Sequence, residues 1–198
     1  MTIYMCNQGM RICITNRKLV KGDFLTQLEY VVAKCQVDRI ILREKDLSES
    51  EYEYLGILVK KLCDSYHVEC FFHNHLGLAK KHQAAGVHLS FSQLQDFYKD
   101  EWKEMKVGCS VHSLEEAFFA QSRGADYLIV SPIYETDCKK GVKGKTPLFI
   151  AQIKSKVNLP VYALGGITKE NEKACIDAGA NGVCRMSAYM NEIMEESE

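Results

Sequence analysis

Several features that mark other protein classes are missing from this 198-residue sequence. No stretch approaches the roughly 18 apolar residues of a membrane-spanning helix, and the first fifteen residues lack the charged start and apolar core of a signal peptide. With 25 Lys and Arg against 26 Asp and Glu, the chain has no net charge suited to a polyanion. We therefore expect a cytoplasmic protein that binds neither nucleic acid nor membranes.

Proline and paired cysteines are also scarce. The chain has only three prolines and no charge blocks, which argues against long disordered segments. Its nine cysteines are odd in number, form no C-x-x-C pair and lie mostly in apolar runs, so they predict a reducing compartment rather than a disulfide framework. No linker or low-complexity stretch divides the sequence, and we expect residues 1–198 to form one domain.

Eight short apolar runs recur along the chain without the alternation of a half-exposed strand. They cover 10–15, 38–43, 68–72, 86–90, 107–111, 127–131, 161–166 and 182–187. Such runs are typical of parallel strands covered on both faces, and segments with helical spacing lie between them, including one that Ser113 and Glu116 open as a capping box. A repeat of about 25 residues is close to the minimum for a βα unit and predicts a compact TIM (β/α)8 barrel. The alternative is an open doubly wound sheet, which would need fewer strands and usually a Gly-rich first turn.

Two glycines, Gly165 and Gly166, follow the seventh run. Adjacent glycines let the backbone approach a ligand closely, and Thr168 is placed to cap the next helix, whose first amides would then face an anion. The loops after strands seven and eight are the usual phosphate site of a βα barrel. We therefore expect phosphate binding here, against the alternative of a Gly-Gly turn without a ligand.

Cationic residues follow the second and sixth runs. Arg43 and Lys45 lie two residues apart, which directs both side chains to the same side and indicates an anionic ligand at the barrel mouth. The alternative is surface pairing of these cations with Glu44 or Asp46. The segment 135–145 contains four lysines, and we interpret it as either a cationic lid or a solvated charge run.

His112 follows the fifth run directly, two residues after Ser110. An imidazole at a strand end suits general acid–base catalysis, although a core or surface histidine is the ordinary alternative. A second histidine-rich group comprises His73, His75 and His88 together with Cys70. This group does not have a recognised zinc-site spacing, so we expect no metal there.

The motifs together resemble the family of thiamine phosphate synthase and its TenI-type relatives over about residues 40–188. They are LREK at 42–45, GVHL at 86–89, S-x-H-S at 110–113, GADY at 124–127, SPI at 131–133, GGI at 165–167 and MSA at 186–188. The resemblance implies a TIM barrel whose substrate phosphate lies on Gly165, Gly166, Met186 and Ser187. It also implies substrate contacts from Arg43, Lys45, Asn74 and Ser110.

Two departures from the synthase pattern favour the TenI-type branch. The resemblance implies that the synthase holds Mg²⁺ with two aspartates, but His75 and Gln93 occupy the matching positions here. Imidazole and amide groups are poor ligands for this hard cation. The T-x-T-K element expected after the sixth strand is represented only by Thr136, Cys138 and Lys139, which we also expect to contact substrate.

The sequence is therefore identified as closest to the TenI-type thiazole tautomerases, isomerases of thiamine biosynthesis. The resemblance implies aromatisation of a carboxythiazole phosphate with His112 as acid–base, Arg43 near the substrate carboxylate and no cofactor. The first alternative is thiamine phosphate synthase, a transferase that would use Mg²⁺, and the second is a non-catalytic phosphometabolite-binding regulator. The chain ends shortly after the eighth run, which leaves a homodimer contact there open.

Overall fold

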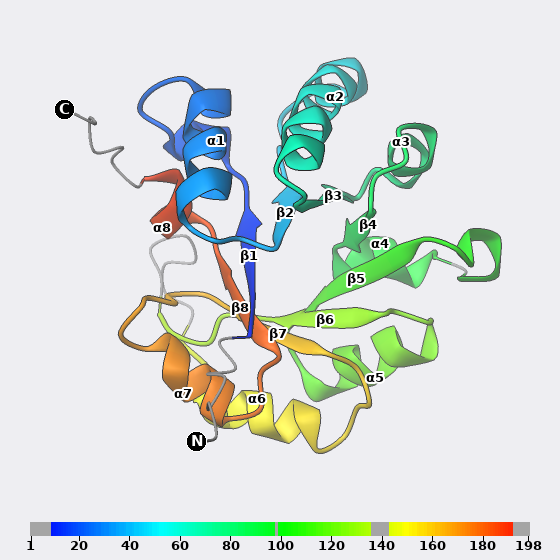
Figure 1. The fold of residues 1–198 in the computed structure, drawn as a ribbon. Helices are drawn as coiled ribbons and strands as arrows, with labels where there is room; N and C mark the ends of the chain where they lie inside the picture. The colour runs from blue at the N-terminus through cyan, green and yellow to red at the C-terminus, as the bar shows by residue number, and fades with distance from the viewer. Residues whose placement is uncertain (1–8, 98, 136–142, 192–198) are drawn as a thin grey trace, which may run out of the picture.

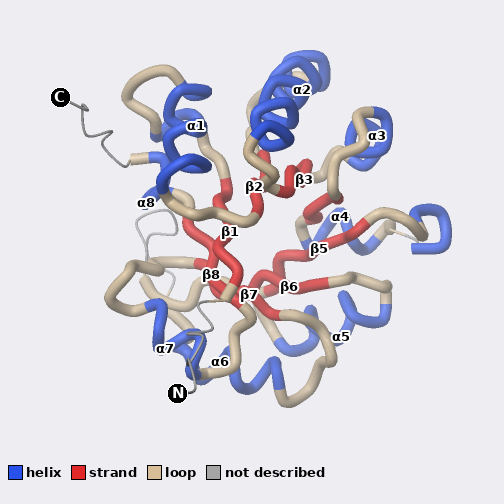
Figure 2. The backbone as a smooth tube through the Cα atoms, viewed as in Figure 1, coloured by secondary structure: helices blue, strands red, loops and turns tan. Residues whose placement is uncertain are grey.

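The computed structural model describes residues 9–97, 99–135 and 143–191. Eight strands form a closed barrel in which each pairs in parallel with its neighbours, and β8 pairs with β1 (Figures 1 and 2). The strands are β1 Met10–Ile14, β2 Arg39–Leu42, β3 Glu69–His73, β4 Gly86–Leu89, β5 Lys106–Val111, β6 Tyr127–Val130, β7 Val161–Leu164 and β8 Gly182–Arg185. This closure confirms the predicted TIM barrel and excludes the open sheet.

Helices surround the strands on the outside of the barrel (Figure 2). They are α1 Phe24–Lys34, α2 Glu49–Ser65, α3 Leu76–Lys81, α4 Phe91–Gln95, α5 Leu114–Ser122, α6 Thr146–Lys154, α7 Glu172–Asp177 and α8 Ser187–Met190, with short 3₁₀ turns at Arg17–Leu19 and Lys99–Trp102. None of the helices within the described ranges is both long and apolar enough to span a bilayer.

The strands carry two separate hydrophobic cores, which explains their lack of alternation. Side chains such as Ile40 and Leu42 of β2 point outward and pack under the helices, whereas Ile41 between them points into the barrel. The inner cluster consists of Ile12, Ile14, Ile41, Phe71, Tyr127, Ile129, Tyr162 and Cys184. Because both faces of each strand are buried, the sequence reads as continuous apolar runs.

The start of α5 differs from the predicted capping box in one bond. The Ser113 hydroxyl accepts from the Glu116 N–H at 3.1 Å, as expected. The Glu116 carboxylate, however, accepts from the His112 N–H at 2.6 Å rather than from Ser113. The cap therefore fixes the backbone of His112, at the point where β5 ends.

Candidate functional site

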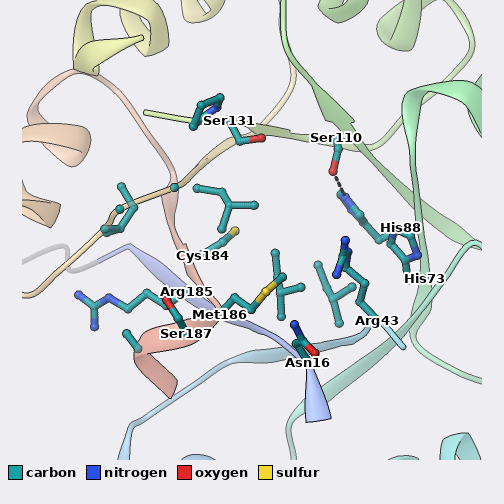
Figure 3. Close-up of a pocket in the computed structure, with 18 of the residues that line it drawn as sticks. Asn16, Arg43, His73, His88, Ser110, Ser131, Cys184, Arg185, Met186 and Ser187 are labelled. Atoms are coloured by element: carbon teal, nitrogen blue, oxygen red, sulfur yellow. Dashed lines mark hydrogen bonds between the residues drawn. The ribbon is translucent and has the colours of Figure 1, made fainter. Parts of the chain in front are cut away.

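Eight expected site residues come together around one cavity at the carboxyl ends of the strands (Figure 3). They are Arg43, Lys45, Ser110, His112, Gly165, Gly166, Met186 and Ser187. These residues follow or end β2, β5, β7 and β8, and the carboxyl ends of parallel barrel strands meet at one face. Figure 3 shows Arg43 and Ser110 on one side of this cavity and Met186 and Ser187 on another.

The carboxylates beside Arg43 and Lys45 are bound by another residue. The buried Glu44 accepts from the Thr15 hydroxyl at 2.7 Å and from the Arg17 guanidinium at 3.1 Å. Asp46 accepts two bonds from the same guanidinium, at 2.7 and 2.8 Å. Arg17 thus binds both carboxylates that we considered as partners of Arg43 and Lys45, and both of these cations line the cavity.

The two cations also influence each other. The positive charge of Arg43, with a smaller contribution from partial burial, lowers the pKa of Lys45. Two neighbouring cations that disfavour each other's charge are stabilised when an anion binds between them. This end of the cavity is therefore suited to a carboxylate or phosphate.

The imidazole of His112 is held in a defined orientation. Its Nδ1 lies 2.8 Å from the carbonyl oxygen of Ser131, at the end of β6. A carbonyl can only accept, so Nδ1 carries the hydrogen and the neutral ring keeps its lone pair on Nε2. Because His112 lines the cavity, Nε2 is the ring nitrogen that remains available to a substrate.

Gly165 and Gly166 close the opposite side of the cavity against the loop after β6. Both have positive φ, at 103° and 62°. A Cβ on Gly165 would lie 2.8 Å from Pro132 Cα, and one on Gly166 would lie 2.6 Å from the Glu135 carbonyl oxygen. Both the backbone conformation and the close approach therefore require glycine.

The expected helix cap at Thr168 is wrong. The Asn171 side chain accepts from the Thr168 N–H at 2.8 Å and donates to the Gly166 carbonyl at 2.8 Å. This closed loop delays the helix, so α7 begins at Glu172 with Asn171 as its N-cap. The Gly-Gly segment itself lies at the cavity, but the first amides of α7 are separated from it by the Thr168–Asn171 loop.

Two buried polar side chains of the barrel interior, His73 and His88, also line the cavity. Their rings are 6.2 Å apart, and His88 contacts Ser110 (Figure 3). Burial, helped by the charges of Arg43 and Lys45, lowers the pKa of His73 to about 3. From the sequence, we considered both histidines only as metal ligands. Their inward positions on β3 and β4 could have been inferred from strand alternation.

Arg185 is a further lining residue that the sequence analysis missed. It is buried, and its guanidinium donates to the Glu172 carboxylate at 2.6 Å. Figure 3 shows its side chain directed away from Ser110 and His88. An arginine within an otherwise apolar run was the signal that could have identified it.

Comparison with known proteins shows the family of this chain and agrees with its fold. The sequence model of a family described as "Thiamine monophosphate synthase" matches residues 12–189. The chain belongs to this family. The thiamine-phosphate synthases of Clostridium botulinum strain Kyoto and Clostridium acetobutylicum are 32% and 30% identical over 90% of this chain, covering 89% and 85% of those proteins. The solved thiamine phosphate pyrophosphorylase of Pyrococcus furiosus superposes with a TM-score of 0.80 at 26% identity, over 94% of this chain and 89% of that one.

The Mg²⁺ implied by resemblance to the family's synthase does not fit the described residues. The ring of His75 stacks on Tyr52 with centroids 3.9 Å apart, Gln93 is exposed on α4, and neither lines the cavity. Within the described ranges, Glu135 is the one carboxylate that lines the cavity, and no three His, Cys, Asp or Glu side chains are placed to hold a metal. Proteins usually hold Mg²⁺ with one or two carboxylates together with substrate phosphates, and His75 and Gln93 supply no carboxylate, so we derive no step through this ion.

The remaining expected residues of this family member are Asn74, Thr136, Cys138 and Lys139. Asn74 does not line the cavity; its amide oxygen accepts from the Ser90 N–H at 2.8 Å and ties the ends of β3 and β4 together. Its contact with substrate stays a prediction. Thr136, Cys138 and Lys139 fall outside the described residues, and Glu135 and Lys143, on either side of them, line the cavity.

Proposed function

We propose that this member of the thiamine monophosphate synthase family is a thiazole tautomerase of the TenI type. It would convert a carboxylated, non-aromatic thiazole phosphate into its aromatic tautomer by proton transfer. The observation that carries the proposal is the orientation of His112, whose Nδ1–H is donated to the Ser131 carbonyl while Nε2 remains for the cavity.

The reaction requires one proton to leave ring carbon C2 and one to reach the exocyclic carbon. His112 Nε2 accepts the first proton, and the imidazolium then donates a proton to the exocyclic carbon, so the ring ends in its starting state. Arg43 and Lys45 attract the substrate carboxylate, and the phosphate lies at Gly165, Gly166 and the start of α8. The aromatic product supplies the driving force, and the sequence of steps uses only side chains of this chain.

A second candidate is thiamine phosphate synthase, which joins hydroxymethylpyrimidine diphosphate to thiazole phosphate. The names of the relatives favour this activity over the tautomerase. Arg43 and Lys45 would also suit a diphosphate, because both cations line the cavity. The side chains of His75 and Gln93 argue against the synthase activity. They do not suit the Mg²⁺ that the resemblance implies for this reaction. The third candidate, a non-catalytic regulator, would bind thiazole phosphate without turnover.

Two assays on the same protein distinguish these functions. In the first, the non-aromatic thiazole carboxylate phosphate is supplied and its ultraviolet change is followed. We expect His112→Gln to lower kcat by about 10²- to 10⁴-fold, the usual contribution of a general acid–base. The matched control is His67→Asn, a substitution of an exposed histidine after α2 whose positive φ suits Asn, and it should retain the wild-type rate.

In the second assay, pyrimidine diphosphate and thiazole phosphate are incubated with Mg²⁺, and thiamine phosphate is measured. A wild-type tautomerase rate no better than that of buffer would rule out our proposal. Thiamine phosphate formation in that case would establish the synthase. Binding of thiazole phosphate with neither turnover would establish the regulator.

A further inference from the structure

His88 lies inside the barrel on β4 and joins a buried tyrosine to the cavity. Its Nδ1 is 3.1 Å from the Tyr127 hydroxyl, and its Nε2 is 2.8 Å from the Ser110 hydroxyl. His88 and Tyr127 are 2% and 3% exposed, whereas Ser110 is half-buried and lines the cavity (Figure 3). The three side chains therefore form a hydrogen-bond chain from the buried layer to the site.

The sequence makes room for this chain at Gly108. In the sheet register Gly108 stands between His88 of β4 and Tyr127 of β6. A Cβ at Gly108 would lie only 2.0 Å from the Tyr127 ring. The missing side chain thus lets the tyrosine ring cross β5 and reach the imidazole.

The direction of the hydrogen bonds follows from what each partner can do. Burial raises the pKa of Tyr127 and lowers that of His88, so the phenol keeps its hydrogen and the imidazole is neutral with one N–H. The guanidinium of Arg39, 4.7 Å from the Tyr127 ring centroid, has no acceptor to offer the phenol. Among the described contacts, His88 Nδ1 is the acceptor available to the Tyr127 hydroxyl.

The tautomer of His88 is then determined. If Nδ1 accepts from Tyr127, the imidazole hydrogen is on Nε2 and is donated to the Ser110 oxygen. The opposite tautomer would leave the buried Tyr127 hydroxyl without its acceptor, and a buried donor without an acceptor is costly. Ser110 loses nothing in the first arrangement, because its own hydrogen can turn toward the cavity.

We propose that Tyr127 and His88 are positioning residues that fix Ser110 as a hydrogen-bond donor to the substrate. Ser110 and His112 lie two residues apart at the end of β5, so the cavity presents a donor beside the acceptor Nε2 of His112. Such a donor selects an oxygen anion or a ring nitrogen with a lone pair. The assignment of the acceptor to a thiazole carboxylate rests on the proposed function. The direction of the hydrogen bonds from Tyr127 through His88 to Ser110 does not.

Nuclear magnetic resonance of the wild-type protein with ¹⁵N-labelled histidine tests the direction without any substrate. We expect the long-range ¹H–¹⁵N pattern of neutral His88 to show the hydrogen on Nε2, and that of neutral His112 to show it on Nδ1. Hydrogen on Nδ1 of His88 would overturn the proposal. This measurement needs no variant and is independent of enzyme activity, so it separates a failure here from a failure of the proposed function.

A double-mutant cycle tests the positioning role with the aromatic carboxythiazole phosphate as the binding probe. We expect Ser110→Ala and Tyr127→Phe each to raise its Kd by about 2- to 10-fold, the value of one hydrogen bond, and Tyr127→Phe to add nothing in the Ser110→Ala background. The control is Tyr162→Phe, which removes a hydroxyl from a neighbouring ring 5.5 Å from Tyr127 and should leave the Kd unchanged. If the two losses of affinity multiply in the double variant, the hydrogen-bond chain from Tyr127 to Ser110 is contradicted.

Discussion

Two arginines, one at the start of β2 and one just after its end, mark the two ends of the barrel. Arg39, at the start of the strand, is 4% exposed, lies 4.1 Å from the Phe71 ring centroid and donates to Glu69 at 2.9 and 2.5 Å. Arg43, just past the end of the strand, lines the cavity. The same residue type therefore packs inside the fold at one end of the barrel and lines the cavity at the other.

The difference lies in the partners that each end supplies. At the amino end, Glu69 accepts from both Arg39 and Lys106, and aromatic rings cover the guanidinium of Arg39. At the carboxyl end, the neighbouring carboxylates Glu44 and Asp46 are bound by Arg17. At the amino end, the two cations thus share one carboxylate, whereas Arg43 at the carboxyl end lines the cavity.

The largest effect that this comparison predicts is on stability. Arg39→Met should lower the free energy of unfolding by about 2 to 4 kcal/mol, because it removes the partner of a partly buried carboxylate and its contact with two rings. Urea unfolding at pH 7 measures this loss. Arg43→Met is the matched control and should change stability by less than about 1 kcal/mol. Equal losses of unfolding free energy in the two variants would show that the two ends of the barrel do not differ in this way.

The next effect is on substrate binding. Arg43→Met should weaken binding of the carboxythiazole phosphate by about 10- to 100-fold, the value of a hydrogen bond to a charged group. Isothermal titration calorimetry measures the Kd. The temperature of unfolding serves as the internal control, since it should stay near the wild-type value. Unchanged affinity would place the carboxylate or phosphate at other residues.

The fold was predictable because each strand is buried on both faces, and such a strand appears in the sequence as a continuous apolar run. The run 86–90 anticipated β4 at Gly86–Leu89 to within one residue, since a parallel strand under a helix has no polar face. The positions of Arg43, Ser110 and His112 around the cavity were predictable for a related reason. They end or follow strands, and all strand ends of a βα barrel meet at one face.

Other features depend on contacts between distant strands and could not be predicted from local pattern. The chain from Tyr127 to Ser110 requires the register that sets Gly108 between β4 and β6. The error at Thr168 has a similar origin, because a bond from Asn171 to the Gly166 carbonyl decides where α7 begins. A cap motif read from neighbouring residues does not reveal which carbonyl its side chain will contact.

The smallest predicted effect is on the pH dependence of stability. It concerns His73, whose neutral ring lies near the cations Arg43 and Lys45. Its pKa of about 3 in the folded chain is below the ordinary 6.5, so between these values the unfolded chain binds a proton that the folded chain does not. Stability should therefore fall as the pH falls from 6.5 toward 3, and this residue contributes at most about 1.4 kcal/mol per pH unit. Urea unfolding between pH 7 and pH 5 should show a shallower loss in His73→Gln than in the wild type. The exposed His67→Asn should retain the wild-type slope, and an unchanged slope in His73→Gln would mean that the cavity end does not keep this histidine neutral.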